Sequence, residues 1–131
     1  MKSQTVLKLM PARKVLVIDD DDTFCMLLAT MLSQWGYSVM TSTQAQSINL
    51  DEMTEADIIF LDMIMPGMSG LEVLDLLSSH QIKSSIVLMS GVENEVLVTA
   101  ETFAKHNDLQ LIGVLYKPFR ASDVIAVLWA T

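Results

Sequence analysis

Short apolar runs alternate along the chain with segments whose apolar residues recur at helical spacing. Continuous apolar runs rich in β-branched residues occupy residues 14–19, 57–62, 85–90 and 111–119, and residues 37–42 form a further plausible run. Runs of this length without polar alternation are typical of strands buried on both faces of a sheet. The pattern therefore predicts five strands.

The segment after the first run has the spacing of an amphipathic helix. Asp21 or Asp22 can cap its first turn, and Gly36 stands where a left-handed C-cap belongs. The predicted apolar stripe of this helix consists of Phe24, Leu27, Leu28, Met31, Leu32 and Trp35.

Helices are also predicted after each of the other strands. They cover residues 43–53, where the pattern is weak, and residues 71–80, 93–106 and 122–130. Five strands that each precede a helix imply an α/β fold, in which helices cover both faces of one parallel sheet through right-handed crossovers. We expect residues 13–131 to form this single domain and residues 1–12 to be a flexible leader.

Composition and charge narrow the classes of function. Apolar residues make up 51% of the chain and charged residues 18%, which argues against disorder. The net charge of −8 argues against direct binding to nucleic acid and favours a cation or a basic protein surface as partner. No apolar run approaches the roughly 18 residues of a membrane span, and no signal-peptide cleavage site is found, so we expect a cytoplasmic protein without membrane contact. The lone Cys25 falls on the helical apolar pattern and is expected to be a small buried hydrophobe.

Chemically active residues follow four of the predicted strands. Asp19 and Asp20 end the first strand, Asp62 the third, Ser90 the fourth and Lys117 the fifth. In a parallel sheet of this kind ligands bind at the carboxyl ends of the strands, so these residues are predicted to converge at one edge. His80 and His106 stand at predicted helix ends, where a ring can bond the last carbonyls, and neither is assigned a catalytic role.

The predicted edge has the components needed for phosphoryl transfer. Three carboxylates supply the hard oxygen ligands that Mg²⁺ prefers. One carboxylate can instead attack a phosphoryl group and become an aspartyl phosphate. Phosphoryl transfer is catalysed mostly by positioning and charge neutralisation, which a metal and the ammonium of Lys117 would provide. The hydroxyl of Ser90 can bond a phosphoryl oxygen and report its arrival.

Two families use such components, and the stretch VLVIDDDDT at residues 15–23 is similar to motifs of both. In the haloacid-dehalogenase-like phosphotransferases it would provide Asp19 as the nucleophile and Asp21 as the general acid. That family also needs an acidic pair on a strand after its lysine, whereas only Asp123 follows here, and it assigns no role to Asp62. This resemblance is therefore the poorer of the two.

Residues 14–130 resemble a response-regulator receiver domain. The motifs are VLVIDDD, IIFLDMIMPGMSG, IVLMSG and YKPF, in that order along the chain. The resemblance implies a flavodoxin-like (βα)5 fold with strand order 2-1-3-4-5. It also implies a switch in two-component signalling, which catalyses its own phosphorylation and dephosphorylation but turns over no separate substrate.

The resemblance assigns a role to each residue at the edge. Asp62 would accept a phosphoryl group from a sensor histidine kinase or a phosphotransfer protein. Asp19 and Asp20 would hold Mg²⁺ together with Asp62, and the backbone carbonyl of Ile64 would complete the protein ligands. Lys117 would pair with the phosphorylated carboxylate.

Other positions would shape and read the site. Ser90 would move toward the phosphate, residues 66–67 would form the loop over the site, and Gly70 would let the next helix start. The family has a cis peptide before the proline that corresponds to Pro118.

The chain departs from the receiver pattern near the fifth strand. Receivers carry an aromatic residue three positions before the lysine, whereas this chain has Val114 there and an aromatic at Tyr116, which we expect on the opposite face of the strand. The stretch from Ser90 to Lys117 also looks longer than in most receivers, and LQLIGVLYKPF resembles receivers joined to cyclic-di-GMP phosphodiesterase domains.

The last helix is too apolar to bury all of its residues. Positions 124–129 are consecutive apolar residues, so we expect the outer face to contact a second copy or an output domain, through the last two helices and the fifth strand. Two alternatives to the switch remain open at this point: a pseudo-receiver that only binds proteins, and the phosphotransferase enzyme.

Overall fold

The structure is a computed structural model that describes residues 13–91 and 95–129, so the predicted leader at residues 1–12 lies outside the described part. All five strands run parallel and are arranged in the order β2-β1-β3-β4-β5. This order is the one implied by the sequence resemblance, and the α/β prediction is confirmed. The strands are β1 (Lys14–Ile18), β2 (Ser38–Ser42), β3 (Ile58–Asp62), β4 (Ser85–Ser90) and β5 (Gln110–Tyr116).

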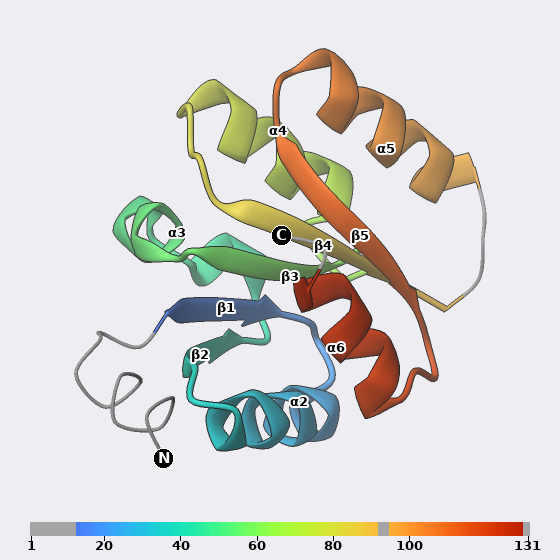
Figure 1. Cartoon of the computed structure of the whole chain (residues 1–131). Helices are drawn as coiled ribbons and strands as arrows, with labels where there is room; N and C mark the ends of the chain where they lie inside the picture. The colour runs from blue at the N-terminus through green and yellow to red at the C-terminus, as the bar shows by residue number, and fades with distance from the viewer. Residues whose placement is uncertain (1–12, 92–94, 130–131) are drawn as a thin grey trace.

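Helices cover both faces of the sheet (Figure 1). Apolar side chains of α2 and α6 pack with one face, and those of α3, α4 and α5 pack with the other. Within the described residues, no helix combines the length and the apolar character that crossing a membrane requires. The α-helices are α2 (Asp22–Gln34), α3 (Leu50–Glu55), α4 (Gly70–Ser79), α5 (Glu95–His106) and α6 (Ala121–Trp129), and a 3-10 turn spans Ala45–Ser47.

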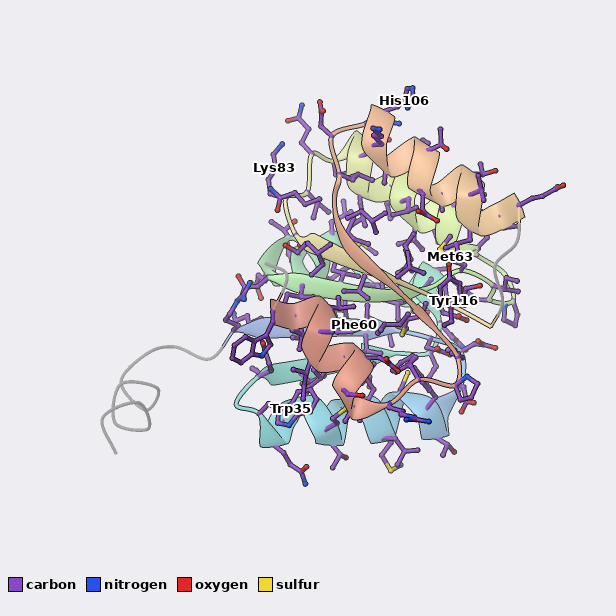
Figure 2. The ribbon with its side chains drawn as sticks, turned by 45° about the vertical axis from the view of Figure 1, so that its right-hand side comes forward. Trp35, Phe60, Met63, Lys83, His106 and Tyr116 are labelled. Atoms are coloured by element: carbon purple, nitrogen blue, oxygen red, sulfur yellow. The ribbon has the colours of Figure 1, made fainter. Side chains whose placement is uncertain are left out.

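Alternate residues of the central strands supply the two halves of the core. In β1, Leu16 and Ile18 face the cluster under α3, α4 and α5, whereas Val15 and Val17 face the cluster under α2 and α6. Phe60 of β3, labelled in Figure 2, belongs to this second cluster and is fully buried. Burial on both faces explains why these strands are continuous apolar runs in the sequence.

The predicted helix at residues 43–53 is wrong in its extent. Ile48 has extended backbone angles, which separate the 3-10 turn from α3. The side chain of Asn49 then caps α3 by accepting the backbone N–H of Glu52 at 2.8 Å. Asparagine favours a cap over a helix interior because its side chain competes for backbone N–H groups.

The stripe predicted for the first helix is only partly correct. Cys25, Leu28 and Leu32 form the buried face of α2, which confirms the prediction for Cys25. Leu27 is 65% exposed because one residue corresponds to about 100° of helix rotation, which carries it away from the face centred on Leu28. Gly36 has φ +94°, as expected for its place after the helix.

Strand β5 contains a β-bulge. Ile86 pairs with Leu111 and Val87 with Gly113, so Ile112 is an extra residue relative to β4. After the bulge, the pairing of the two strands continues to Ser90 and Tyr116 at the carboxyl end of the sheet.

Gly70 begins α4 against the backbone that follows β3, and we predict that Gly70→Ala destabilises the fold. A Cβ atom there would lie 2.8 Å from the Cα of Met63 and 2.9 Å from the carbonyl oxygen of Asp62. Because backbone atoms cannot rotate away, we expect a net loss of about 1 to 3 kcal/mol in the free energy of unfolding, measured by urea denaturation.

The matched control is Gly91→Ala, whose Cβ would meet no described atom within 4 Å. We expect this variant to change stability by less than about 0.5 kcal/mol. Equal urea midpoints for the two variants would contradict the close approach at Gly70.

Candidate functional site

The carboxyl ends of β1, β3, β4 and β5 meet at one edge of the sheet, where the sequence predicts a site. Hydrogen bonds continue past the strand ends and position the residues that follow. Asp19 donates its backbone N–H to the carbonyl oxygen of Ser42 at 3.1 Å, and Lys117 donates its backbone N–H to that of Ser90 at 2.7 Å. The backbone of each neighbouring strand therefore fixes where these functional residues begin.

Three aspartates lie together at this edge. Asp19 is fully buried, Asp62 is 7% exposed and Asp20 is exposed to solvent. Each offers a carboxylate oxygen, and these oxygens lie within 4.8 Å of one another. The predicted convergence of the acid pair with Asp62 is thus present in the structure.

The other two aspartates of the run have a different place. Asp21 caps α2, since its carboxylate accepts the backbone N–H of Phe24 at 3.1 Å. Asp22 is the first residue of α2, and both side chains are exposed. Asp21 therefore takes part in helix capping, whereas the phosphotransferase alternative would need it beside Asp19 as a general acid.

Lys117 links the two buried carboxylates. Its ammonium donates a hydrogen bond to Oδ2 of Asp19 and lies 3.4 Å from Oδ1 of Asp62. Burial by itself lowers the pKa of Lys117. The hydrogen bond to Asp19 and the charge of Asp62 raise this pKa by more than burial lowers it, so the pKa lies above its ordinary value. The lysine stays charged and offsets part of the repulsion between the carboxylates.

The Asp62 carboxyl has an unusual affinity for protons. Burial is the largest cause and the charge of Asp19 the next, and together they raise its pKa to about 6 although Lys117 acts in the opposite direction. Asp62 is therefore mainly ionised at neutral pH and more basic than an ordinary carboxylate.

The donor set suits a hard divalent cation. Mg²⁺ takes oxygen ligands at about 2.1 Å in an octahedron, which spaces neighbouring oxygens about 3 to 4 Å apart. The oxygens of Asp19, Asp20 and Asp62 lie within 4.8 Å of one another, so a small movement of their side chains would bring them to that spacing. The exposure of Asp20 leaves one side of the cluster open to water. The residues present fit a magnesium ion.

Ser90 and the loop after β3 lie at the same edge of the sheet as the carboxylates. Ser90 is 2% exposed and ends β4, where it is in register with Tyr116 of β5. Ile64 lies in the loop after β3 with its side chain 65% exposed, and Gly67 has φ +85° there. The metal-binding role of the Ile64 carbonyl stays a prediction.

The prediction that Tyr116 lies on the opposite face of β5 from Val114 is wrong. Val114 packs with the cluster under α5, and Leu115 packs with the cluster under α6. Because strand residues two apart share a face, Tyr116 lies on the face of Val114 and is 44% exposed. Figure 2 shows Tyr116 at the same end of the molecule as Met63, which follows Asp62.

Peripheral features agree with the sequence analysis. The peptide between Lys117 and Pro118 is cis, as the resemblance implied. The ring of His106 lies 3.1 Å from the carbonyl oxygen of Thr102 at the end of α5, and Figure 2 shows it far from Met63. This contact with a carbonyl of the last turn is the one expected for a histidine at a helix end.

Sequence reasoning missed the aromatic residues that border Lys117. The Lys117 ammonium lies 4.3 Å from the centre of the Phe24 ring, and this ring meets Phe119 in a T-shaped pair with centres 5.5 Å apart. Phe24 was expected only in the apolar stripe of its helix. An aromatic in the first turn of a helix that directly follows the acid pair is the signal that could have revealed it.

The raised pKa of Asp62 predicts a pH-dependent stability. Because its folded-state value of about 6 exceeds the ordinary value of 3.8, folding favours the protonated form, and this stability is lost as pH rises from about 4 to about 6. Without divalent cations, we expect Asp62→Asn to be more stable than the wild type at pH 7.5, because the variant has no buried charge at this position. Its free energy of unfolding should be higher by roughly 1 to 2 kcal/mol. Urea denaturation across pH 3.5 to 8 measures the difference, which should vanish at the acid end.

Asp75→Asn is the matched control, because Asp75 is an exposed carboxylate on α4. Its pH profile should follow that of the wild type. If Asp62→Asn also followed the wild-type profile, the buried-carboxylate argument would be wrong.

Comparisons with known proteins agree with this fold and site. The response regulator receiver domain family matches residues 15–128. The cell cycle transcriptional regulator CtrA of Caulobacter vibrioides is 31% identical over 118 residues, which are 89% of this chain and 49% of CtrA. The transcription factor SKN7 of Candida albicans is 29% identical over 120 residues, which are 90% of this chain and 20% of SKN7.

A solved structure extends the likeness to three dimensions. A response regulator from Colwellia psychrerythraea is 30% identical with a TM-score of 0.73, and the match covers 92% of this chain and 94% of that one. The chain spans about half the length of CtrA, so the comparison with that relative concerns one domain of it. With its family match, its strand order and its acidic edge together, the chain belongs to the response regulator receiver domains of two-component signalling.

Proposed function

We propose that this chain is a phosphorylation switch whose phosphoacceptor is Asp62. The observation that carries the proposal is the position of Asp62, a basic, nearly buried carboxylate at the end of β3 between a carboxylate pair and the ammonium of Lys117. The donor is a phosphohistidine of a sensor histidine kinase or of a phosphotransfer protein. An acidic chain of net charge −8 favours a donor with a basic docking surface.

The transfer forms one bond and breaks one. A carboxylate oxygen of Asp62 attacks phosphorus, the phosphorus–nitrogen bond of the phosphohistidine breaks, and the imidazole leaves as its nitrogen takes up a proton. Because its pKa is about 6, Asp62 is ionised at neutral pH and is a stronger base than an ordinary aspartate.

Asp19, Asp20, Asp62 and the carbonyl of Ile64 would hold Mg²⁺ at this edge. When bound there, the ion would neutralise negative charge on the phosphoryl oxygens. Lys117 orients the Asp62 carboxylate before transfer, and after it the ammonium pairs with the modified side chain. Ser90 donates its hydroxyl to a phosphoryl oxygen, which draws the end of β4 toward the site.

The switch acts without turnover of a separate substrate, and we place it in the cytoplasm with its kinase. A pseudo-receiver would keep the fold and lose the chemistry. The three clustered carboxylates and the paired Lys117 favour the working switch over that alternative.

We propose that the switch is read on the side of the molecule formed by α5, β5 and α6. Ile125 is 40% exposed and Trp129 is 85% exposed on α6, as expected from its apolar sequence. Val98 of α5 and Tyr116 of β5 add further exposed apolar surface. Such surface favours contact with a second copy or an output domain.

Phosphoryl acceptance is tested by intact mass. We expect the chain incubated with Mg²⁺ and acetyl phosphate to gain one phosphoryl group, and Asp62→Asn to gain none because the nucleophile is gone. Asp75→Asn, which keeps the edge intact, should gain the group as the wild type does.

The other outcomes separate the alternatives. A phosphoryl group located on Asp19 by peptide mapping would support the enzyme reading. No gain with acetyl phosphate or with a phosphorylated histidine donor would support the protein-binding module and overturn the switch.

The readout surface is tested by hydrogen exchange. We expect phosphorylation to change amide exchange in α5, β5 and α6, because Ser90 joins the site to β5 through the hydrogen bond to Lys117. Peptides from α3 serve as the internal control and should be unaffected. Exchange that changes only around Asp62 would contradict this surface.

A further inference from the structure

The ring of Phe24 lies against the ammonium of Lys117, the lysine that also binds two carboxylates of the site. The Lys117 ammonium lies 4.3 Å from the ring centre while it donates to Asp19 and lies 3.4 Å from Asp62. A cation over an aromatic face at this distance is attracted by the negative potential of the ring. The ammonium is therefore held by two carboxylates and one ring.

The backbone alone does not fix this ammonium. β5 ends at Tyr116, so Lys117 lies just beyond the strand on a flexible side chain with four methylene groups. Its side chain remains 26% exposed, which leaves room for other rotamers. Contacts at the tip of the side chain must select the conformer that reaches both carboxylates.

The Phe24 ring is itself well anchored. The backbone N–H of Phe24 donates a hydrogen bond to the Asp21 carboxylate at 3.1 Å, and this bond fixes the first turn of α2. On the ring, the T-shaped contact with Phe119 makes an interplanar angle of 88°. Cys25, the next residue, donates its thiol to the carbonyl of Asp19 at 3.2 Å, which ties this turn to the acid pair.

We propose that Phe24 is a positioning residue of the phosphoryl-transfer site, where its ring face, braced by Phe119, holds the Lys117 ammonium between Asp19 and Asp62. This inference rests on the proposed function for its kinetic effect. In this arrangement, the cap that Asp21 forms on α2 also helps to position the Phe24 ring.

The test replaces Phe24 by phenylalanines with one, two and three ring fluorines. Fluorination weakens the negative potential of the face stepwise and changes ring shape little. We expect the rate of phosphorylation by acetyl phosphate at saturating Mg²⁺ to fall with each fluorine, by about threefold to tenfold for the trifluorinated ring, with the melting temperature unchanged.

The same series at Phe103 is the matched control. That ring is half-buried and packs against the core under α5, on the other face of the sheet. Its fluorination should leave the rate unchanged. Phe24→Leu should be slow and Phe24→Trp fast, because only the second keeps an aromatic face.

A second readout does not depend on phosphorylation. In NMR spectra of the unphosphorylated chain, the two Hε protons of an immobilised Lys117 have different shifts, and we expect this difference to shrink as Phe24 is fluorinated. If the wild type accepted no phosphoryl group, the proposed function would fail while this measurement still tested Phe24.

Two results would overturn the inference. One is a Lys117 signal that is the same across the fluorinated series. The other is a phosphorylation rate that is flat across the series while Phe24→Leu lowers only the melting temperature, since Phe24 would then contribute packing alone.

Discussion

The pairing of a buried carboxylate with a lysine from the far end of the chain is the interaction on which this structure depends. Asp19 is fully buried, and an unpaired charge in that position would be strongly destabilising. Its two oxygens are bound by the ammonium of Lys117 and by the backbone N–H of Asp21. The same lysine reaches Asp62, so one cation serves two acids that would otherwise repel each other.

The parallel sheet makes this pairing possible. Asp19 and Lys117 are separated by most of the chain, yet β1 and β5 both end at the edge where β3 places Asp62. The core on each face is apolar and close to fully buried, so the strands are held firmly and their ends keep their spacing. Close packing at Gly70 extends that rigidity to the loop after β3.

The electrostatic state of the edge suits the proposed phosphorylation switch. Burial, together with the charge of Asp19, raises the pKa of Asp62, and the three clustered carboxylates would attract a divalent cation. A phosphoryl group on Asp62 changes the charge that Lys117 must balance, and Lys117 is bonded through its backbone to Ser90. The charge of Asp62 is thus connected to the ends of β4 and β5 through the side chain and the backbone of Lys117.

Local sequence rules succeeded where one interaction decides the structure, and they failed where several compete. The buried strands, the cap at Asp21 and the left-handed Gly36 follow from the residues themselves. The helix predicted for residues 43–53 is wrong in its extent, because Asn49 caps a helix that begins only at Leu50. The prediction for Tyr116 is an exception, because the alternation of strand residues alone places its side chain on the face of Val114.

The sequence by itself determined the order of elements and the residue types at the strand ends, because burial requires apolar periodicity and the motifs are local. It therefore predicted the acid pair, Asp62, Ser90 and Lys117 as one edge. Only the tertiary structure decided which acid the lysine binds, how far the pKa of Asp62 rises and that Phe24 faces the ammonium. These properties depend on distances and burial between segments far apart in the chain, and no local pattern encodes them.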